Sequence, residues 1–365
     1  MALIKVKSNG VDDTTNLGRR NILINGAMRI HQRGNQTSSQ NNQIYFIDRF
    51  NFYHNSSTAV ANLQQSTDVP SGQGFSNSLL MDITTIDSAP GSTAVAVLRQ
   101  IIEGHNLQHL AYGTGSAKTI TLSFWVKSPK TGTHIIEIYH LSSPTNRTIS
   151  KSYTVNSANT WEYKKIQFPG DTAQTIANNN AYAFAVQWPM FAGGNFTSGT
   201  LQTTWGNLTN ANRFVGQQNL FDNTSNNFFI TGTQLEVGNM DTPFEHIPFG
   251  EELSLCQRYY TKSWAYGNTV NTNPGVITAA CVGNVNRAFG NVFWPTEMRT
   301  TPTVTWYSGS NGTVNKWRNG STGTDINPPS AIAAIGTKGY GYVLSSGISS
   351  VTDTLQGHYE AIAEL

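Results

Sequence analysis

Residues 120–127 have the sequence Ile120-Thr121-Leu122-Ser123-Phe124-Trp125-Val126-Lys127, in which large apolar side chains recur at every second position. Successive side chains of a strand point to opposite faces of a sheet. One face of the predicted strand therefore carries Ile120, Leu122, Phe124 and Val126. The other carries Thr121, Ser123, Trp125 and Lys127. This pattern predicts a strand with one face in a core.

Similar short runs recur between turn signals from Gln43 to about Gly250. They are residues 45–53, 134–139, 152–155, 161–168, 182–188 and 228–237. Seven or eight strands in about 200 residues, with almost no helical pattern between them, favour a β-sandwich or jelly roll over a parallel α/β fold. The plausible helices are residues 94–105 and 251–259.

Beyond residue 259 the chain is richer in Gly, Trp and Tyr. Further strands are predicted at residues 276–282, 287–293, 303–307, 340–344 and 357–365. The whole chain is therefore predicted to be all-β. Its predicted parts are a short N-terminal segment (1–40), a jelly-roll β-sandwich (41–250), a helical linker (251–259) and a smaller C-terminal β-sandwich (260–365). Residues 1–40 are too short for a core of their own, so they must pack on the next domain, another subunit or a larger assembly.

Charged side chains are scarce. The 365 residues include 23 Lys or Arg and 21 Asp or Glu, which is 12% of the chain, against about 25% in an ordinary soluble domain. Neutral amides and hydroxyls must supply the surface polarity. A net charge of +2 leaves no strong basic field, which argues against nucleic acid as a partner. The sequence also has neither an apolar run long enough to span a membrane nor a signal-peptide pattern, so we expect no membrane insertion and no secretory route.

The cysteine and histidine patterns suggest no metal or cofactor. Cys256 and Cys281 are too few for a disulfide framework and have no metal-site neighbours. We expect two buried thiols, with a single bridge between them as the alternative. His105 and His109 have the spacing of two metal ligands on a helix, but no third ligand accompanies them, and a solvated loop is the default.

No catalytic motif stands out. The sequence lacks a nucleophile elbow, a phosphate-binding loop and a dinucleotide-binding fingerprint. Glycoside hydrolysis requires two carboxyl groups at a set separation, and the few candidates, Asp48, Glu137, Asp171 and Glu236, lie in patterns that indicate surface positions. We therefore predict a protein that is not an enzyme and has no catalytic residues, although two of these groups meeting in space would support catalysis.

Several aromatic residues stand among neutral amides and hydroxyls. Flat rings stack on the apolar faces of sugars, while Asn, Gln and Thr pair with sugar hydroxyls, so this composition suits carbohydrate binding. Trp317 is the strongest candidate because its sequence neighbours are all polar, and Trp205 is the next. The other candidates are Trp264, Trp306 and Tyr307. Core packing is the alternative for each ring, since β-sandwich cores also use Trp and Tyr.

Two parts of the chain resemble a known family. The first is Asn21-Ile22-Leu23-Ile24-Asn25-Gly26-Ala27-Met28-Arg29-Ile30-His31-Gln32-Arg33-Gly34, followed by Ile47-Asp48-Arg49-Phe50. The second is Thr233-Gln234-Leu235-Glu236-Val237-Gly238, then Thr242-Pro243-Phe244-Glu245-His246, then Gly250-Glu251-Glu252-Leu253-Ser254-Leu255-Cys256-Gln257-Arg258-Tyr259-Tyr260. Together they resemble bacteriophage tail fibres and related receptor-binding virion proteins, which have a carbohydrate-module-like jelly roll and a C-terminal β tip domain.

The resemblance implies a structural virion protein of the viral tail, made in the bacterial cytoplasm and assembled as a homotrimer. Its C-terminal domain would face the host and bind a surface glycan or another receptor. Its N-terminus would attach to another tail or virion protein, through Leu17, Ile22, Leu23, Ile24, Met28 and Ile30. No catalytic residue is transferred from the family. Two alternatives remain open, a non-catalytic adaptor or decoration protein of the tail or capsid, and a polysaccharide depolymerase.

Overall fold

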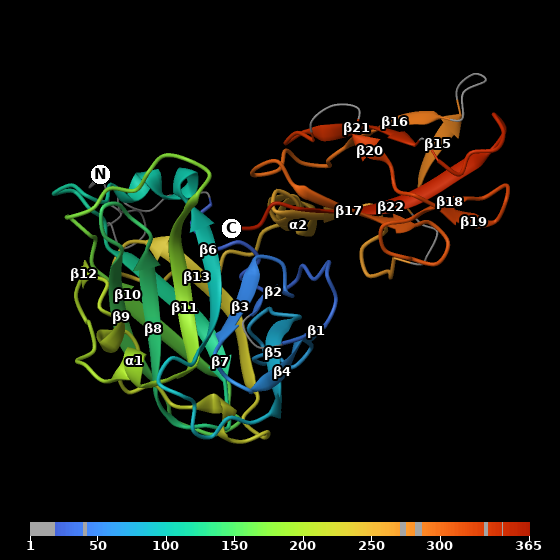
Figure 1. Ribbon diagram of the computed structural model, residues 1–365. Helices are drawn as coiled ribbons and strands as arrows, with labels where there is room; N and C mark the ends of the chain where they lie inside the picture. The colour runs from blue at the N-terminus through green and yellow to red at the C-terminus, as the bar shows by residue number, and fades with distance from the viewer. Residues whose placement is uncertain (1–18, 39–41, 271–274, 282–286, 332–334, 345) are drawn as a thin grey trace, which may run out of the picture. The chain divides into compact units, whose positions relative to one another are not determined.

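The computed structural model describes residues 19–38, 42–270, 275–281, 287–331, 335–344 and 346–365. These residues form two compact units, with the boundary between Pro248 and Phe249 (Figure 1). Both units are built almost entirely from antiparallel strands, which confirms the predicted all-β class.

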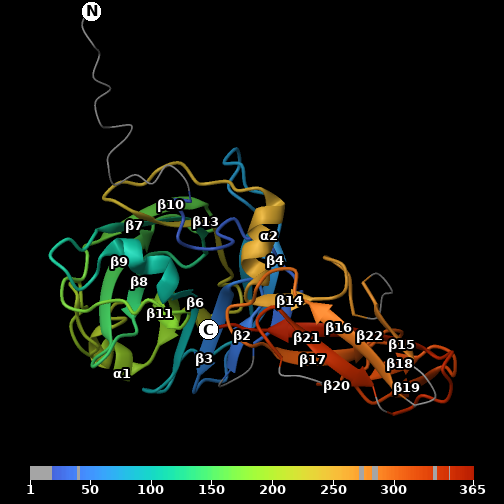
Figure 2. The same ribbon diagram turned by 90° about the horizontal axis from the view of Figure 1, so that it is seen from above.

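The first unit is a sandwich of two antiparallel sheets, which form separate layers in Figure 2. The six-stranded sheet has the order β1 (Gln36–Thr37), β4 (Val60–Ser66), β5 (Ser78–Thr85), β13 (Phe228–Val237), β7 (Ile120–Lys127), β10 (Glu162–Phe168). The seven-stranded sheet has the order β12 (Gly206–Asn207), β9 (Arg147–Val155), β8 (Gly132–His140), β11 (Tyr182–Ala192), β6 (Val95–Glu103), β3 (Phe50–Asn55), β2 (Asn42–Tyr45). Short helices connect them: η1 (Gly104–Leu110), α1 (Gly194–Thr197), η2 (Asn210–Asn212) and η3 (Leu220–Asp222).

The core of the first unit lies between these two sheets. The predicted inner face of β7 is confirmed, because the side chains at positions 120, 122, 124 and 126 have no solvent exposure. Phe124 meets two rings of the opposite sheet edge-on, Trp188 of β11 at 5.7 Å and Tyr153 of β9 at 5.2 Å between centroids. Full burial of each large apolar side chain contributes about 1.5–3 kcal/mol.

The predicted helix at residues 94–105 is wrong. Residues 95–103 form β6, a central strand that pairs with β3 on one side and β11 on the other. Its two faces are both largely buried, so its sequence lacks the apolar–polar alternation that marks a half-exposed strand. Only the following turn is helical: η1 contains His105 and His109, both exposed.

The predicted strand at residues 45–53 is a hairpin instead. β2 ends at Tyr45 and β3 begins at Phe50. Arg49, just before β3, has a left-handed backbone conformation (φ 70°), which a continuous strand does not allow.

The N-terminal stretch that carries the family resemblance runs along β13. The amide of Ile22 donates to the carbonyl of Leu235 at 2.8 Å, and the amide of Thr233 donates to the carbonyl of Gly26 at 2.9 Å. The Asn21 side chain donates to the Thr233 carbonyl and accepts from the Leu235 amide, at 2.9 and 3.0 Å. A Cβ atom at Gly26 would overlap the Thr233 carbonyl, so the close approach requires glycine.

The second stretch closes the same network. Glu236 accepts from the amide and hydroxyl of Thr242 at 2.9 and 2.7 Å. The side-chain oxygen of Gln234 accepts from the Glu245 amide at 2.8 Å, and the Glu245 carboxylate accepts from the Asn21 amide at 2.8 Å. Hydrogen bonds within the first unit thus join two motifs that are more than 200 residues apart in the sequence.

Residues 19–38 are therefore part of the first unit and not a separate segment. The core buries three of the residues predicted to anchor the chain to a virion: Leu23, Met28 and Ile30. Since these side chains already pack in the sandwich, the prediction that they anchor the chain to another protein is wrong. Ile22 and Ile24 are partly buried, and Leu17 lies outside the described residues.

The second unit begins with α2 (Phe249–Gln257), which fills most of the predicted helical segment. Its sheet has the order β19 (Thr324–Ile326), β18 (Trp317–Asn319), β22 (Thr354–Ile362), β15 (Ile277–Cys281), β16 (Ala288–Phe293), β21 (Gly339–Leu344), β20 (Ser330–Ala331). Two more strands, β14 (Tyr260–Lys262) and β17 (Thr303–Ser308), also pair with β22.

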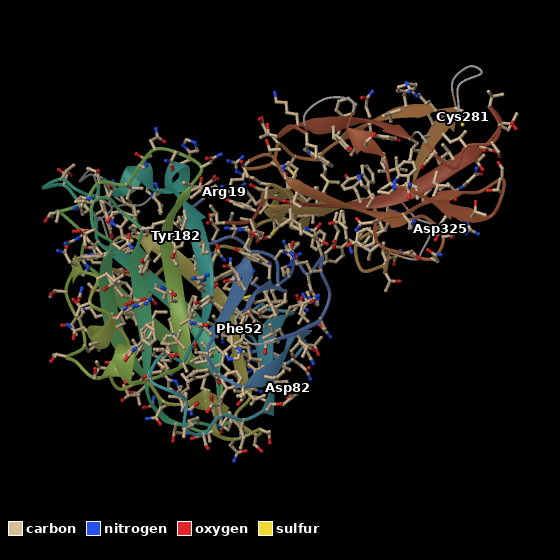
Figure 3. The ribbon with its side chains drawn as sticks, viewed as in Figure 1. Arg19, Phe52, Asp82, Tyr182, Cys281 and Asp325 are labelled. Carbon is tan, nitrogen blue, oxygen red and sulfur yellow. The ribbon has the colours of Figure 1, made fainter. Side chains whose placement is uncertain are left out.

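Aromatic side chains dominate the core of the second unit: Trp294, Trp306, Trp317, Tyr340, Tyr342 and Tyr359. The two cysteines are thiols and not a bridge. Cys256 is buried, and Cys281, which lies on β15 and is labelled in Figure 3, is partly buried.

Candidate functional site

Four polar side chains form a row across the outer face of the seven-stranded sheet. The strand register places Asn51 of β3 opposite Arg99 of β6. Arg99 in turn lies opposite Gln187 of β11, and Gln187 lies opposite Glu137 of β8. Paired residues of neighbouring strands project to the same face, whereas the residues before and after them project into the core. The row is therefore a direct consequence of the register.

Glu137 is fully buried beneath this face and is held by three donors. Arg213 donates its Nε and Nη2 to the two carboxylate oxygens at 2.9 and 2.7 Å, and Gln187 donates its Nε2 at 2.9 Å. Burial alone would lower the pKa of Arg213, but Glu137 raises that pKa above its ordinary value. The bidentate pair holds Arg213, which follows η2 in the chain, over the sheet.

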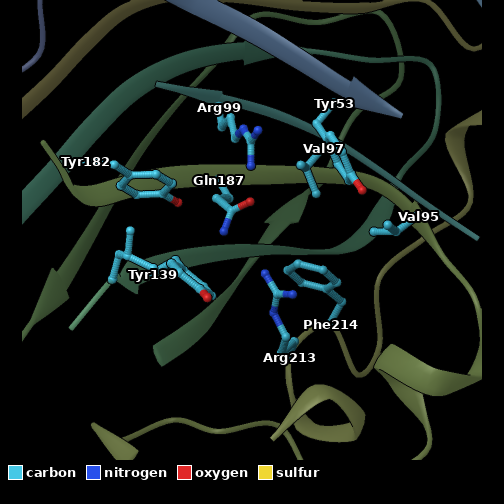
Figure 4. A pocket seen from close by; sticks show the side chains of 10 residues that line it. Tyr53, Val95, Val97, Arg99, Tyr139, Tyr182, Gln187, Arg213 and Phe214 are labelled. Atoms are coloured by element: carbon cyan, nitrogen blue, oxygen red, sulfur yellow. The ribbon is translucent and has the colours of Figure 1, made fainter. Parts of the chain in front are cut away.

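A cavity of about 260 Å³ opens over the row (Figure 4). Its aromatic lining is Tyr53, Tyr139, Tyr182 and Phe214. Its aliphatic lining is Val95, Val97 and Leu141. Its polar lining is Arg99, Gln187 and Arg213. These residues come from β3, β6, β8 and β11, from Leu141 directly after β8, and from the loop that carries Arg213 and Phe214. We call this cavity the outer-face cleft.

Three tyrosines and two guanidinium groups shape the outer-face cleft. In Figure 4, Arg99 lies between Tyr182 and Tyr53 with its guanidinium directed toward Gln187. Its Cζ lies 5.0 Å from the centre of the Tyr53 ring. The rings of Tyr139 and Tyr182 are 6.2 Å apart and inclined by 48°.

The lining of the cleft offers a ligand aromatic ring faces and hydrogen-bonding groups. Burial raises the pKa of Tyr139 and of Tyr182, so both hydroxyls stay protonated at neutral pH and can donate as well as accept. The described residues that line the cleft include no carboxyl group, imidazole or thiol. Flat rings beside amide, hydroxyl and guanidinium groups suit a ligand with both apolar faces and polar edges.

The four carboxyl groups predicted to lie at the surface are buried: Asp48, Glu137, Asp171 and Glu236 are at most 3% exposed. The prediction was wrong because each carboxylate is satisfied by donors within the first unit. The Asp48 carboxylate accepts from the backbone and side chain of Gln32, and Asp171 accepts from Arg147 Nε at 2.6 Å. Among the described residues, no group of three or more His, Cys, Asp or Glu is placed to hold a metal ion.

Three of the predicted sugar-stacking rings are core residues of the second unit. Trp317 has no exposed surface and meets Trp306 at 5.5 Å and Tyr342 at 5.3 Å between centroids. Trp306 and Trp264 are 5% and 8% exposed. The prediction was wrong because Arg318 projects to the opposite face of β18, while Asn319, on the same face as Trp317, is itself buried and donates to Asp353. Gly357 on the adjacent β22 leaves room for the ring, which a Cβ atom there would overlap.

The other two predicted rings are partly buried and lie outside the cleft. Tyr307 donates its hydroxyl to Glu360, and its ring meets Trp264 edge-on at 5.6 Å. Trp205 packs against the core of the first unit and donates its indole N–H to the Pro169 carbonyl at 2.6 Å. Both rings have their polar atoms occupied within the fold.

The second unit has a groove of its own, of about 380 Å³. It is lined by residues of β14, β15, β16 and β22, including Lys262, Asn291 and Tyr359. Phe293, at the end of β16, is 78% exposed and contributes to this lining.

The outer-face cleft is not evident from the sequence, because the pattern of residues 94–105 predicts a helix there. A strand assignment would have placed Val95, Val97 and Arg99 on one face by their period of two. The same period places Glu137 with Tyr139 in the strand that was predicted at residues 134–139. Within the described part of the chain, none of the helices has the length and apolar content to cross a bilayer.

No protein-family model matches the chain, and no curated protein is significantly similar to it. Among solved structures, an enzymatically active domain of tailspike protein 4 from bacteriophage CBA120 is 14% identical with a TM-score of 0.30, and the match covers 60% of this chain and 21% of that chain. The C-terminal family 22 carbohydrate-binding module of Clostridium thermocellum Xyn10B is 13% identical with a TM-score of 0.28, over 50% of this chain and 85% of that chain. A family 11 carbohydrate-binding module of a Clostridium thermocellum cellulosomal cellulase is 15% identical with a TM-score of 0.27, over 57% and 97%. Matches at this identity and TM-score assign no function to this chain.

Proposed function

We propose that the first unit binds a saccharide in the outer-face cleft and does not change it chemically. The observation that carries this proposal is the placement of Tyr53, Tyr139 and Tyr182 around a polar row that the strand register sets in place. Sugar rings present C–H faces to aromatic rings and hydroxyls to amides and guanidinium groups.

The size and lining of the cleft fit this role. Its volume of about 260 Å³ lies just below the usual range of small-molecule sites, about 300–1,000 Å³, and so suits about one or two sugar rings. The absence of a carboxyl group from the described residues of the lining supports binding over hydrolysis, because glycoside hydrolysis uses a pair of carboxyl groups.

The biological setting that we propose is attachment of a bacteriophage to its host. This part rests on the motifs at residues 21–34, 47–50 and 233–260, which resemble those of tail fibres and receptor-binding virion proteins. A homotrimer would present three clefts to a repetitive cell surface, where linked sites raise avidity by about 10²–10⁴ over a single site. The virion partner would then bind another surface than the buried residues Leu23, Met28 and Ile30.

The test is a saccharide array probed with the intact chain, followed by calorimetric titration of the best ligand. Tyr53→Ala should weaken binding by about 1–2 kcal/mol, roughly 5- to 30-fold, because it removes a ring from the cleft wall. The matched control is Tyr163→Ala on β10 of the other sheet, where the ring is 40% exposed. Equal losses in the two variants, or an array without any bound saccharide, would contradict the proposal. Release of reducing ends from the bound polymer would show a depolymerase instead.

A further inference from the structure

We infer that the outer-face cleft selects saccharides that carry a carboxylate, such as uronic acid units, and that Arg99 is the residue that recognises this group. The inference rests on the proposed saccharide-binding function. It follows from the difference between the two guanidinium groups that line the cleft.

Arg213 is already neutralised. Both of its hydrogen bonds to Glu137 are short, at 2.9 and 2.7 Å, and the carboxylate belongs to the buried floor. A ligand carboxylate at Arg213 would have to compete with this bidentate pair. Arg213 therefore serves to cover Glu137 and to pack on the rings of Tyr139 and Phe214, which lie 5.4 and 4.7 Å from its Cζ.

Arg99 is paired with neutral groups. Its Nε donates to the side-chain oxygen of Asn51 at 2.9 Å, and its Nη2 donates to that of Gln43 at 3.2 Å. Among the described residues, no carboxylate lies within ion-pair distance of Arg99. With Arg213 and Glu137 cancelling each other, the lining and floor of the cleft carry one net positive charge.

The donors that remain on Arg99 have the geometry for a carboxylate. A guanidinium group has five N–H donors in a planar fork, and the two bonds to Asn51 and Gln43 use one on Nε and one on Nη2. Two donors on Nη1 and one on Nη2 have no acceptor among the described residues. The parallel N–H groups at the end of the fork match the two oxygens of a carboxylate.

The surroundings hold the fork in place. Asn51 and Gln43 bond one side of it, the Tyr53 ring lies 5.0 Å away, and Gln187 lies opposite Arg99 in the register. An ion pair formed in a partly enclosed cleft is stronger than one in open solvent, because the effective dielectric constant is lower there. A neutral sugar hydroxyl would accept from Arg99 but would leave its charge without a partner.

The experiment compares bacterial surface polysaccharides before and after chemical reduction of their carboxyl groups to primary alcohols, using the full chain. The wild-type chain should bind the unreduced polymers at least about tenfold more tightly. Arg99→Gln should bind both forms equally, at the affinity of the wild type for the reduced form. Arg99→Lys keeps the charge without the fork and should retain part of the preference.

Lys165→Gln removes the same charge from β10 of the other sheet, where that side chain is 59% exposed, and should keep the full preference. Thermal unfolding of each variant checks that it folds. If reduction leaves wild-type binding unchanged, or if sulfated polymers are preferred over carboxylated ones, the inference is overturned while saccharide binding stands. If neither form binds, the proposed function fails and the inference fails with it.

Discussion

Two groups of aromatic rings, one in each unit, differ in the face of the sheet that they occupy. In the second unit, Trp306 and Trp317 fill the core, whereas in the first unit Tyr53, Tyr139 and Tyr182 line a cleft on the outer face. The sequence surroundings suggest the reverse, because Trp317 has polar neighbours. The residues immediately before and after a strand residue therefore do not predict its exposure, because they point to the other face of the sheet.

The strongest test of this comparison is Trp317→Ala. The ring has no exposed surface and packs edge-on against Trp306, so its loss should cost about 3–5 kcal/mol of the free energy of unfolding of the second unit. Urea unfolding followed by circular dichroism measures this. Saccharide binding by the first unit should not change. If the variant is as stable as the wild type and binds saccharide more weakly, Trp317 stacks on the sugar and is not a core ring.

The second test concerns the N-terminal stretch of the first unit. Met28 is fully buried in the sandwich core, so Met28→Ala should destabilise the first unit by about 2–5 kcal/mol. Met240→Ala is the matched control, because Met240 is 66% exposed and its loss should change stability by less than about 0.5 kcal/mol. Equal stability of the two variants, measured by urea unfolding, would mean that residues 19–38 are not part of the core.

The third test is the acid sensitivity of the first unit. Burial lowers the pKa of His134, whose ring nitrogens contact the Lys130 carbonyl and the Gln217 amide group. The folded chain therefore keeps this ring neutral at a pH where the unfolded chain, with an ordinary pKa of about 6.5, takes up a proton. The contribution of the neutral His134 ring to the free energy of unfolding should therefore be full above about pH 6.5. Below that pH it should decrease, by up to about 1.4 kcal/mol per pH unit.

The measurement is urea unfolding of the first unit at a series of pH values between about 7 and 5, a range above the ordinary carboxyl pKa values. His134→Gln should make the curve shallower in this range, and part of the slope should remain because burial also lowers the pKa of His140. Identical slopes for wild type and His134→Gln would show that His134 does not contribute to the acid sensitivity.

The smallest expected effect belongs to Phe293→Ser. This ring is 78% exposed at the end of β16, so its removal should change the free energy of unfolding by no more than about 0.5 kcal/mol. Comparison of its stability loss with that of Trp317→Ala, in the same unit, distinguishes an exposed ring from a core ring. A loss of several kcal/mol in this variant would mean that Phe293 is buried in solution.

Part of the fold and site could be predicted from the sequence, and part could not. The alternation of apolar and polar residues at 120–127 was sufficient to predict β7 and its buried face, because a period of two is a local property of the chain. The same rule failed for β6, because a central strand covered on both faces shows no alternation. With residues 94–105 predicted as a helix, Arg99 could not be placed beside Gln187. The cleft could therefore not be predicted.

Composition and local periodicity were sufficient to predict the all-β class, the position of most strands and the neutral, amide-rich character of the surface. Which aromatic rings face solvent and which carboxylates are buried depends instead on the folded arrangement of the strands. The same arrangement pairs Glu137 with Arg213, 76 residues apart, beneath the cleft. The physical reason is that register and layer packing join residues that are distant in the chain, and no local pattern specifies which strands become neighbours.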